Sequence, residues 1–183
     1  MKKGLKILLA ADGFILFAFG LLAPIYAIFV EHIGGDILDA GFAYAIYSFV
    51  LGVALYFICK WENHQKHKEK LVILSYFLYA VGALGYIFVA NRYHLFIVQA
   101  VLGIAEAVNS PVFDGLFSKF LDKGKSVYEW GMYASLKNIA GGISAILGGV
   151  LVLYFGFKGL FSIMLAISLI GFFISIKLRK TKS

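Results

Sequence analysis

Six long apolar stretches dominate this sequence of 183 residues, and each approaches or exceeds the roughly 20 residues that a helix needs to cross a membrane. They lie at residues 5–30, 40–59, 71–90, 93–113, 130–155 and 157–176. Their apolar residues are continuous rather than alternating, which favours helices over the strands of a transmembrane barrel. Hydrophobic residues make up 61% of the chain, more than in a typical soluble domain. The sequence therefore predicts an all-α, polytopic membrane protein with a single six-helix domain over residues 1–183, embedded in a lipid bilayer.

The basic residues between these stretches predict the topology. Fourteen of the 17 Lys and Arg residues lie in alternate tails and links, at residues 2–6, 60–70, 119–125 and 177–182. The link after the first stretch instead carries Glu31, Asp36 and Asp39. The positive-inside rule places the basic segments, and so both termini, in the cytoplasm, and we expect a plasma-membrane protein. The net charge of +7 is then a topology signal, and we expect no nucleic-acid partner.

Polar side chains inside the apolar stretches mark a candidate transport pathway, because lipid does not tolerate them. The candidates are Asp12, Gln99, Glu106, Asn109, Lys137 and Asn138. Helical spacing places several of them in rows with small residues, a pattern typical of close helix contacts in membranes. The rows are Gln99, Gly103, Glu106 and Ser110 in one stretch, and two parallel rows in the next: Lys137, Gly141, Ser144 and Gly148, and Asn138, Gly142, Ala145 and Gly149. The glycines expected at such contacts are Gly103, Gly141, Gly142, Gly148 and Gly149. Pro24 and Pro111 are candidate hinge positions, since proline disturbs a helix.

Three of the candidate residues are charged and lie at one predicted depth. Asp12, Glu106 and Lys137 each lie about seven residues from a cytoplasmic helix end, or about 10 Å inside the membrane face. One interpretation is a static bridge between Glu106 and Lys137 that ties two helices together. The other is a polar cavity in which these groups meet a solute. By contrast, the stretches 71–90 and 157–176 carry no charge in their interior, so we expect that both can face lipid all round and lie outside the polar interior.

Enzyme and metal functions find little support. The chain has no Gly-x-Ser-x-Gly, His-Glu-x-x-His or Cys-x-x-Cys motif. His64 and His67 could bind a metal together, but the lysines around them repel cations. The single Cys59 allows no internal disulfide. We therefore expect no enzyme activity, no metal and no cofactor.

The whole chain resembles one half of a known family of transporters, and three places carry the resemblance: the basic link at residues 60–70 and two segments in the second half of the chain. LGIAEAVNSPVFDGLFSKFLDKGK, at residues 102–125, is similar to the Gly-rich fourth helix and charged loop of the major facilitator superfamily. WGMYASLKNIAGGISAILGGVLVLYFGFKGLF, at residues 130–161, is similar to the family's fifth helix and its turn into the sixth. The chain departs from the family's pattern where Gln99 occupies the position of the helix-four arginine.

The resemblance implies one six-helix half of such a transporter, most like the N-terminal half, with a 3+3 inverted repeat. In the family, helices one and four line the pathway, two and five contact the other half, and three and six lie outside. It implies a secondary transporter of a small solute that acts as a homodimer or with a second six-helix half. The alternative is a scaffold or assembly subunit that kept the bundle and lost transport.

Overall fold

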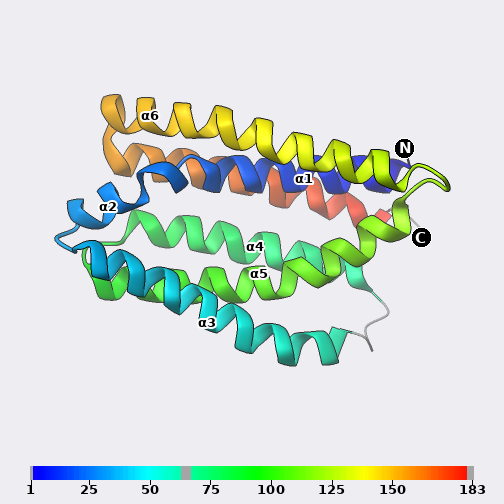
Figure 1. Cartoon of the computed structure of the whole chain (residues 1–183), viewed down its shortest axis with the longest axis horizontal. Helices are drawn as coiled ribbons and strands as arrows, with labels where there is room; N and C mark the ends of the chain where they lie inside the picture. The colour runs from blue at the N-terminus through cyan, green and yellow to red at the C-terminus, as the bar shows by residue number, and fades with distance from the viewer. Residues whose placement is uncertain (1, 63–66, 181–183) are drawn as a thin grey trace.

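The computed structural model describes residues 2–62 and 67–180, and every regular element in these residues is helical. The elements are α1 (Lys3–Gly20), η1 (Ala23–Ile25), α2 (Tyr26–His32), α3 (Ile37–Glu62), α4 (Lys68–Ile87), α5 (Arg92–Phe120), α6 (Ser126–Ile176) and η2 (Lys177–Lys180). They form an elongated bundle whose helices run along its long axis (Figure 1). The all-α prediction is thus confirmed.

Five segments of the described chain are long and apolar enough to cross a membrane: Lys3–His32, Ile37–Lys60, Lys68–Ile87, Arg92–Phe120 and Ser126–Arg179. The last one spans 54 residues but is broken at Gly156, where φ is 67° and ψ is 178°. Only glycine adopts this conformation readily. The chain reverses there, and the two arms of α6, residues 126–155 and 157–176, run back along each other (Figure 1).

The two prolines lie in different backbone settings. The helix that begins at Lys3 stops at Gly20, and Pro24 lies in the short 3₁₀ turn η1 before α2 resumes. This is the interruption that a proline near the end of a long helix predicts, because proline lacks an N–H group. Pro111 lies inside α5, which continues on both sides of it as far as Phe120. α5 therefore extends seven residues past the expected boundary at Phe113, since Leu116, Phe117 and Phe120 are buried.

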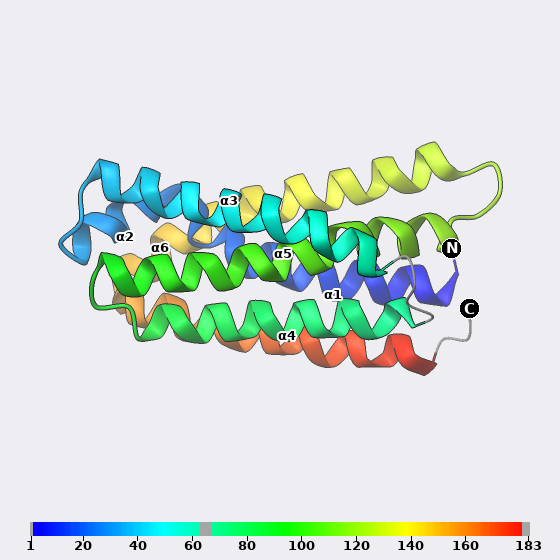
Figure 2. The same ribbon diagram turned by 90° about the horizontal axis from the view of Figure 1, so that it is seen from below.

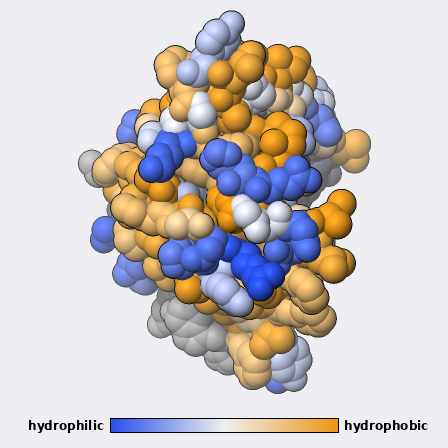
Figure 3. All heavy atoms as spheres, turned by 90° about the vertical axis from the view of Figure 1, so that its left-hand side faces the viewer, coloured by the Kyte–Doolittle hydropathy of each residue, from blue (hydrophilic) through white to orange (hydrophobic). Residues whose placement is uncertain are grey.

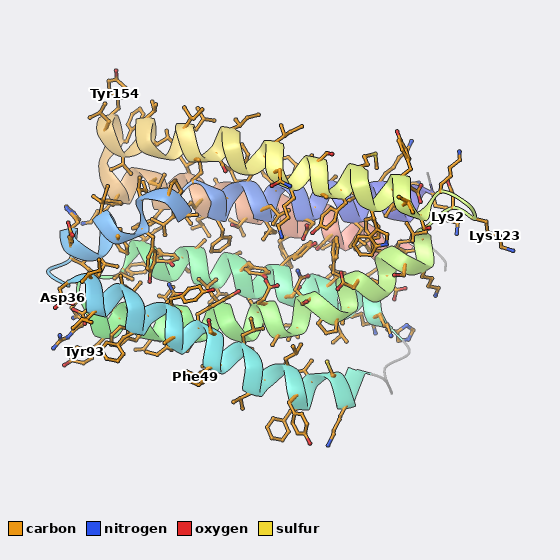
Figure 4. The ribbon with its side chains drawn as sticks, viewed as in Figure 1. Lys2, Asp36, Phe49, Tyr93, Lys123 and Tyr154 are labelled. Atoms are coloured by element: carbon orange, nitrogen blue, oxygen red, sulfur yellow. The ribbon has the colours of Figure 1, made fainter. Side chains whose placement is uncertain are left out.

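The two ends of the bundle carry different charges. Both termini lie at one end (Figure 1), together with Lys2 and Lys123, while Asp36, Tyr93 and Tyr154 lie at the other (Figure 4). At the first end, the Lys2 ammonium donates to the carbonyl of Leu121 at 3.1 Å, beside the C-terminus of α5. At the second end, hydrophilic residues gather across the centre of the surface, with apolar residues around them (Figure 3). The alternation of charge along the sequence thus becomes a separation of charge in space.

The acidic link is folded against the bundle rather than free. The backbone N–H of Asp39 donates to the Asp36 carboxylate at 2.9 Å, and the backbone N–H of Asp36 donates back to Asp39 at 3.2 Å. This reciprocal pair closes the N-terminus of α3 in the manner of a capping box. The Arg92 guanidinium lies 3.4 Å from the Asp39 carboxylate and ties α5 to the same point.

The helices divide into an inner pair and two outer sides. Figure 2 shows α3 and the first arm of α6 on one side, α4 and the second arm of α6 on the other, and α1 and α5 between them. α1 packs along α6, while α5 packs along α3 and α4. α3 is the least covered of these helices, because few of its residues are buried within the chain.

The expectation that residues 71–90 and 157–176 face lipid all round is wrong. Half of the apolar window of α4 is buried inside the bundle, including Ser75, Tyr76 and Tyr79. The second arm of α6 buries Phe161 and Met164. That expectation considered only charged residues. Hydroxyl groups also require polar partners inside a membrane protein, so an uncharged helix can still pack into the core. Both helices therefore contribute one face to the core.

Candidate functional site: a tyrosine-lined cavity

A cavity of about 640 Å³ lies between α1, α3, α4, α5 and the first arm of α6. It brings together five of the six pathway candidates: Asp12, Gln99, Glu106, Asn109 and Lys137. The rest of its wall is largely aromatic and aliphatic, and it includes six tyrosines: Tyr26, Tyr44, Tyr47, Tyr79, Tyr86 and Tyr133. Such a mixture of apolar wall and a few polar groups is typical of sites for small molecules.

Asp12 lies on the wall of the cavity but is closed off from it. The residue is 3% exposed, and each carboxylate oxygen accepts a hydrogen bond from one tyrosine hydroxyl. Tyr76 donates to Oδ1 at 3.1 Å and Tyr133 donates to Oδ2 at 2.9 Å. The three side chains come from α1, α4 and α6, so the carboxylate joins three helices through charge-assisted hydrogen bonds. This arrangement compensates the cost of burying a charge.

Glu106 and Lys137 also line the cavity, and they differ from Asp12 in how they are satisfied. Glu106 on α5 is half-buried, and its Oε2 accepts a hydrogen bond from the Tyr79 hydroxyl. Lys137 on α6 is exposed. Within residues 2–62 and 67–180, no ion pair joins these two residues, and Lys137 has no hydrogen-bond partner. The geometry therefore gives no support to a static bridge between them.

Gln99 and Asn109 are both buried and each contacts a neighbouring helix. Gln99 Nε2 donates to the hydroxyl of Tyr26 at 2.6 Å and to that of Tyr86 at 3.3 Å. Asn109 Oδ1 accepts from the Ser75 hydroxyl at 3.1 Å. These bonds join α5 to α2 and α4, so both amides have partners inside the bundle.

The two small-residue rows of α6 face different surroundings. In the row that begins at Lys137, Ser144 and Gly148 are buried, and a Cβ on Gly148 would collide with the backbone of Leu21. Gly141 lies in the same row, and its Cα is 3.8 Å from where a Cβ on Gly20 would lie.

The second row, which begins at Asn138, is open within this chain. A Cβ on Gly142 or Gly149 would meet nothing within 4 Å. Asn138 itself is exposed, does not line the cavity, and donates to the Ala134 carbonyl of its own helix at 2.8 Å. On α5, a Cβ on Gly103 would come 2.7 Å from the Tyr47 carbonyl, so α3 and α5 are in close contact there.

Comparison with known proteins decides the family. A sequence model described as Major Facilitator Superfamily matches residues 8–183, nearly the whole chain. The chain belongs to the Major Facilitator Superfamily. It is a multi-pass membrane protein of a transporter family.

Two curated relatives are similar to this superfamily member. The uncharacterized MFS-type transporter MJ1560 of Methanocaldococcus jannaschii is 26% identical over 139 residues, which are 76% of this chain and 36% of that protein. The uncharacterized MFS-type transporter YitZ of Bacillus subtilis is 25% identical over 145 residues, which are 79% of this chain and 88% of that protein.

A solved structure shares the fold. The crystal structure of the POT family transporter PepTSo superposes with a TM-score of 0.82 over 100% of this chain and 38% of that chain, at 15% identity. The chain thus spans little more than a third of PepTSo and of MJ1560, but most of YitZ.

The sequence analysis did not predict that tyrosines of α4 are hydrogen-bond partners of the polar residues at the candidate site. Tyr76, Tyr79 and Tyr86 lie on one face of α4, at a spacing of three and seven residues, and all three are buried. This spacing was a usable signal, since buried tyrosines in an uncharged membrane helix need hydrogen-bond partners. Charge alone directed attention to the other helices.

The described residues give no support to the metal-binding interpretation of His64 and His67. The part of the chain that the structure describes contains no cluster of three or more His, Cys, Asp or Glu residues that could hold a metal ion. His64 lies outside the described residues, and His67 is exposed.

Proposed function

We propose that this chain is one six-helix half of a secondary transporter for a small solute, and that it works with a second bundle. In this proposal the two arms of α6 each cross the membrane, which gives six crossings in a 3+3 inverted repeat. The basic end of the bundle, with both termini, lies in the cytoplasm and the protein lies in the plasma membrane. Rocking of the two bundles about the bound solute would expose the cavity to each side in turn.

The exposure of Lys137 and Asn138 carries this proposal. Both side chains lie on a membrane-length helix and are exposed within this chain. A lysine facing hydrocarbon would cost about 3 kcal/mol on insertion scales. Lys137 also lines the cavity, together with Tyr44 of α3, which is 68% exposed. The cavity therefore reaches the surface between α3 and α6, where a protein or water-filled wall removes that cost.

A second bundle would supply that wall. The apolar side chains of α3 and of the first arm of α6 are largely exposed, among them Phe49 at 75% and Ile146 at 72%. Two copies with the same membrane orientation could meet on this face around a two-fold axis along the membrane normal. A separate six-helix half would meet the same face. The similarity to MJ1560 and PepTSo, which are longer, supports a pathway between two bundles.

Uptake into proteoliposomes tests transport. Radiolabelled small solutes should accumulate with the unchanged chain, and Glu106→Gln and Lys137→Met should each reduce the initial rate by at least about tenfold, as expected when a charge-assisted contact is lost. Glu31→Gln and Lys158→Met are matched controls, because both side chains are exposed outside the cavity lining. Unchanged uptake in both cavity variants would reject the cavity role. Correctly assembled protein without uptake of any solute would favour the scaffold alternative.

Cross-linking in membranes tests the partner. In a Cys59→Ser background, Gly142→Cys on the open face of α6 should form a disulfide between two copies if the protein is a homodimer. Phe173→Cys, 61% exposed on the second arm, is the control and should not. The absence of a cross-link at Gly142 would reject the homodimer and leave a separate second half.

A further inference from the structure

We infer that the cavity takes a solute that carries an ammonium group and a carboxylate on one apolar body. This inference rests on the proposed transport function and names the class of solute that the same cavity would hold. It follows from which of the three charged groups a solute can reach.

Burial removes Asp12 from contact with the solute. Asp12 is 3% exposed, and each of its carboxylate oxygens already accepts a hydrogen bond, from Tyr76 or from Tyr133. The hydrogen bonds of Asp12 therefore hold α1, α4 and α6 together. It lines the cavity but offers little surface to a bound molecule, because it is only 3% exposed.

Glu106 and Lys137 remain within reach, and they carry opposite charges. Glu106 is half-buried, and only its Oε2 accepts a hydrogen bond from the described residues, so Oε1 is free to accept another. The Lys137 ammonium is exposed on the cavity wall and has no hydrogen-bond or ion-pair partner in the described part of the chain.

The two groups lie on different walls of one cavity. Glu106 projects from α5 and Lys137 from α6, and both line the same space of about 640 Å³. A solute amine can donate to Glu106 Oε1 while a solute carboxylate accepts from Lys137. Each contact is a charge-assisted hydrogen bond, and a solute with only one charge would leave the other protein group unpaired in a sheltered space.

The rest of the wall suits an apolar body. Tyr26, Tyr44, Tyr47 and Phe19 present aromatic rings, and Leu16 and Leu102 add aliphatic surface. The volume falls in the range of about 300–1,000 Å³ that is usual for sites of small molecules. An amino acid with a large apolar side chain has this chemistry and fits this space.

A matched series of ligands tests the solute class. L-Phenylalanine, phenethylamine and 3-phenylpropionate share one apolar body and carry both charges, only the ammonium, or only the carboxylate. L-Leucine, isoamylamine and 4-methylpentanoate repeat the comparison. Binding of each to the full chain in lipid nanodiscs is measured by calorimetry. We expect at least one zwitterion to bind about tenfold or more tightly than both of its single-charge analogues.

Variants assign each charge to its partner. Lys137→Met should weaken the zwitterion to the level of its amine analogue and leave the amine unchanged, while Lys137→Arg should keep most of the binding. Glu106→Gln should weaken the zwitterion to the level of its carboxylate analogue. The inference is overturned if an amine or a carboxylate alone binds as tightly as the zwitterion, or if neither zwitterion binds to the folded chain.

The outcomes separate this inference from the proposed function. Zwitterion binding that depends on both residues, without uptake into proteoliposomes, would keep the solute class and reject transport. Uptake of a singly charged solute that depends on Glu106 alone would keep transport and reject the solute class.

Discussion

Asp12 and Lys137 are both charged side chains inside membrane-length helices, but their surroundings are opposite. Asp12 is enclosed by three helices and has a hydroxyl donor on each oxygen. Lys137 is exposed on the first arm of α6 and has no hydrogen-bond partner within residues 2–62 and 67–180. The difference separates a closed side of the bundle, where α1, α4 and α6 meet, from an open side, where α3 and α6 border the cavity. We therefore expect charges on the closed side to serve structure, and those on the open side to be available to a partner or a solute.

Thiol labelling is the most direct test of the division into closed and open sides, because a cysteine on the open side should react and one on the closed side should not. In a Cys59→Ser background, Lys137→Cys should react rapidly with a charged, water-soluble thiol reagent. Ser144→Cys is two turns along the same row and is 0% exposed against α1, so it should react only after unfolding. Labelling rates of the protein in nanodiscs are measured by mass spectrometry. Equal rates at the two positions would contradict the division into closed and open sides.

Replacing a glycine of α6 with a larger residue should destabilise the protein on the closed side of the bundle but not on the open side. Gly148→Val would drive a Cβ into the backbone of Leu21 and should destabilise the bundle by about 3 kcal/mol or prevent its folding. Gly149→Val adds the same side chain on the open side, where nothing lies within 4 Å, and should leave the bundle folded. The yield of monodisperse protein and its unfolding temperature measure both effects. A folded, stable Gly148→Val variant would mean that α1 and α6 are farther apart than described.

Removal of a single hydroxyl is expected to have a smaller effect. Tyr76→Phe leaves one oxygen of the buried Asp12 without its donor and should cost about 1.5–3 kcal/mol. Tyr44→Phe on the open side is the control and should change stability by less than about 0.5 kcal/mol, because Tyr44 is 68% exposed. Thermal unfolding in detergent gives both values. Equal shifts would show that the Asp12 network does not stabilise the bundle.

The helices and the polar positions could be predicted from the sequence because they depend on local order. Membrane length and continuous apolar runs indicate helices, and Gly156 marks a reversal in the longest one. Helical periodicity also grouped Gln99 with Glu106 and Lys137 with Ser144. What periodicity could not predict is which of these faces meets another helix.

The tertiary structure alone decided which polar groups are satisfied. Tyr76 and Tyr133 are 57 positions apart in the chain, and they meet on Asp12 only because three helices pack at one level. The same packing placed Gly148 against Leu21 and left Gly142 open, although both rows of α6 read alike in sequence. A sequence specifies the donors, acceptors and small residues of each helix, since these are properties of single residues. The distances between helices decide which of them are paired, because a hydrogen bond or a close contact exists only over a few ångströms.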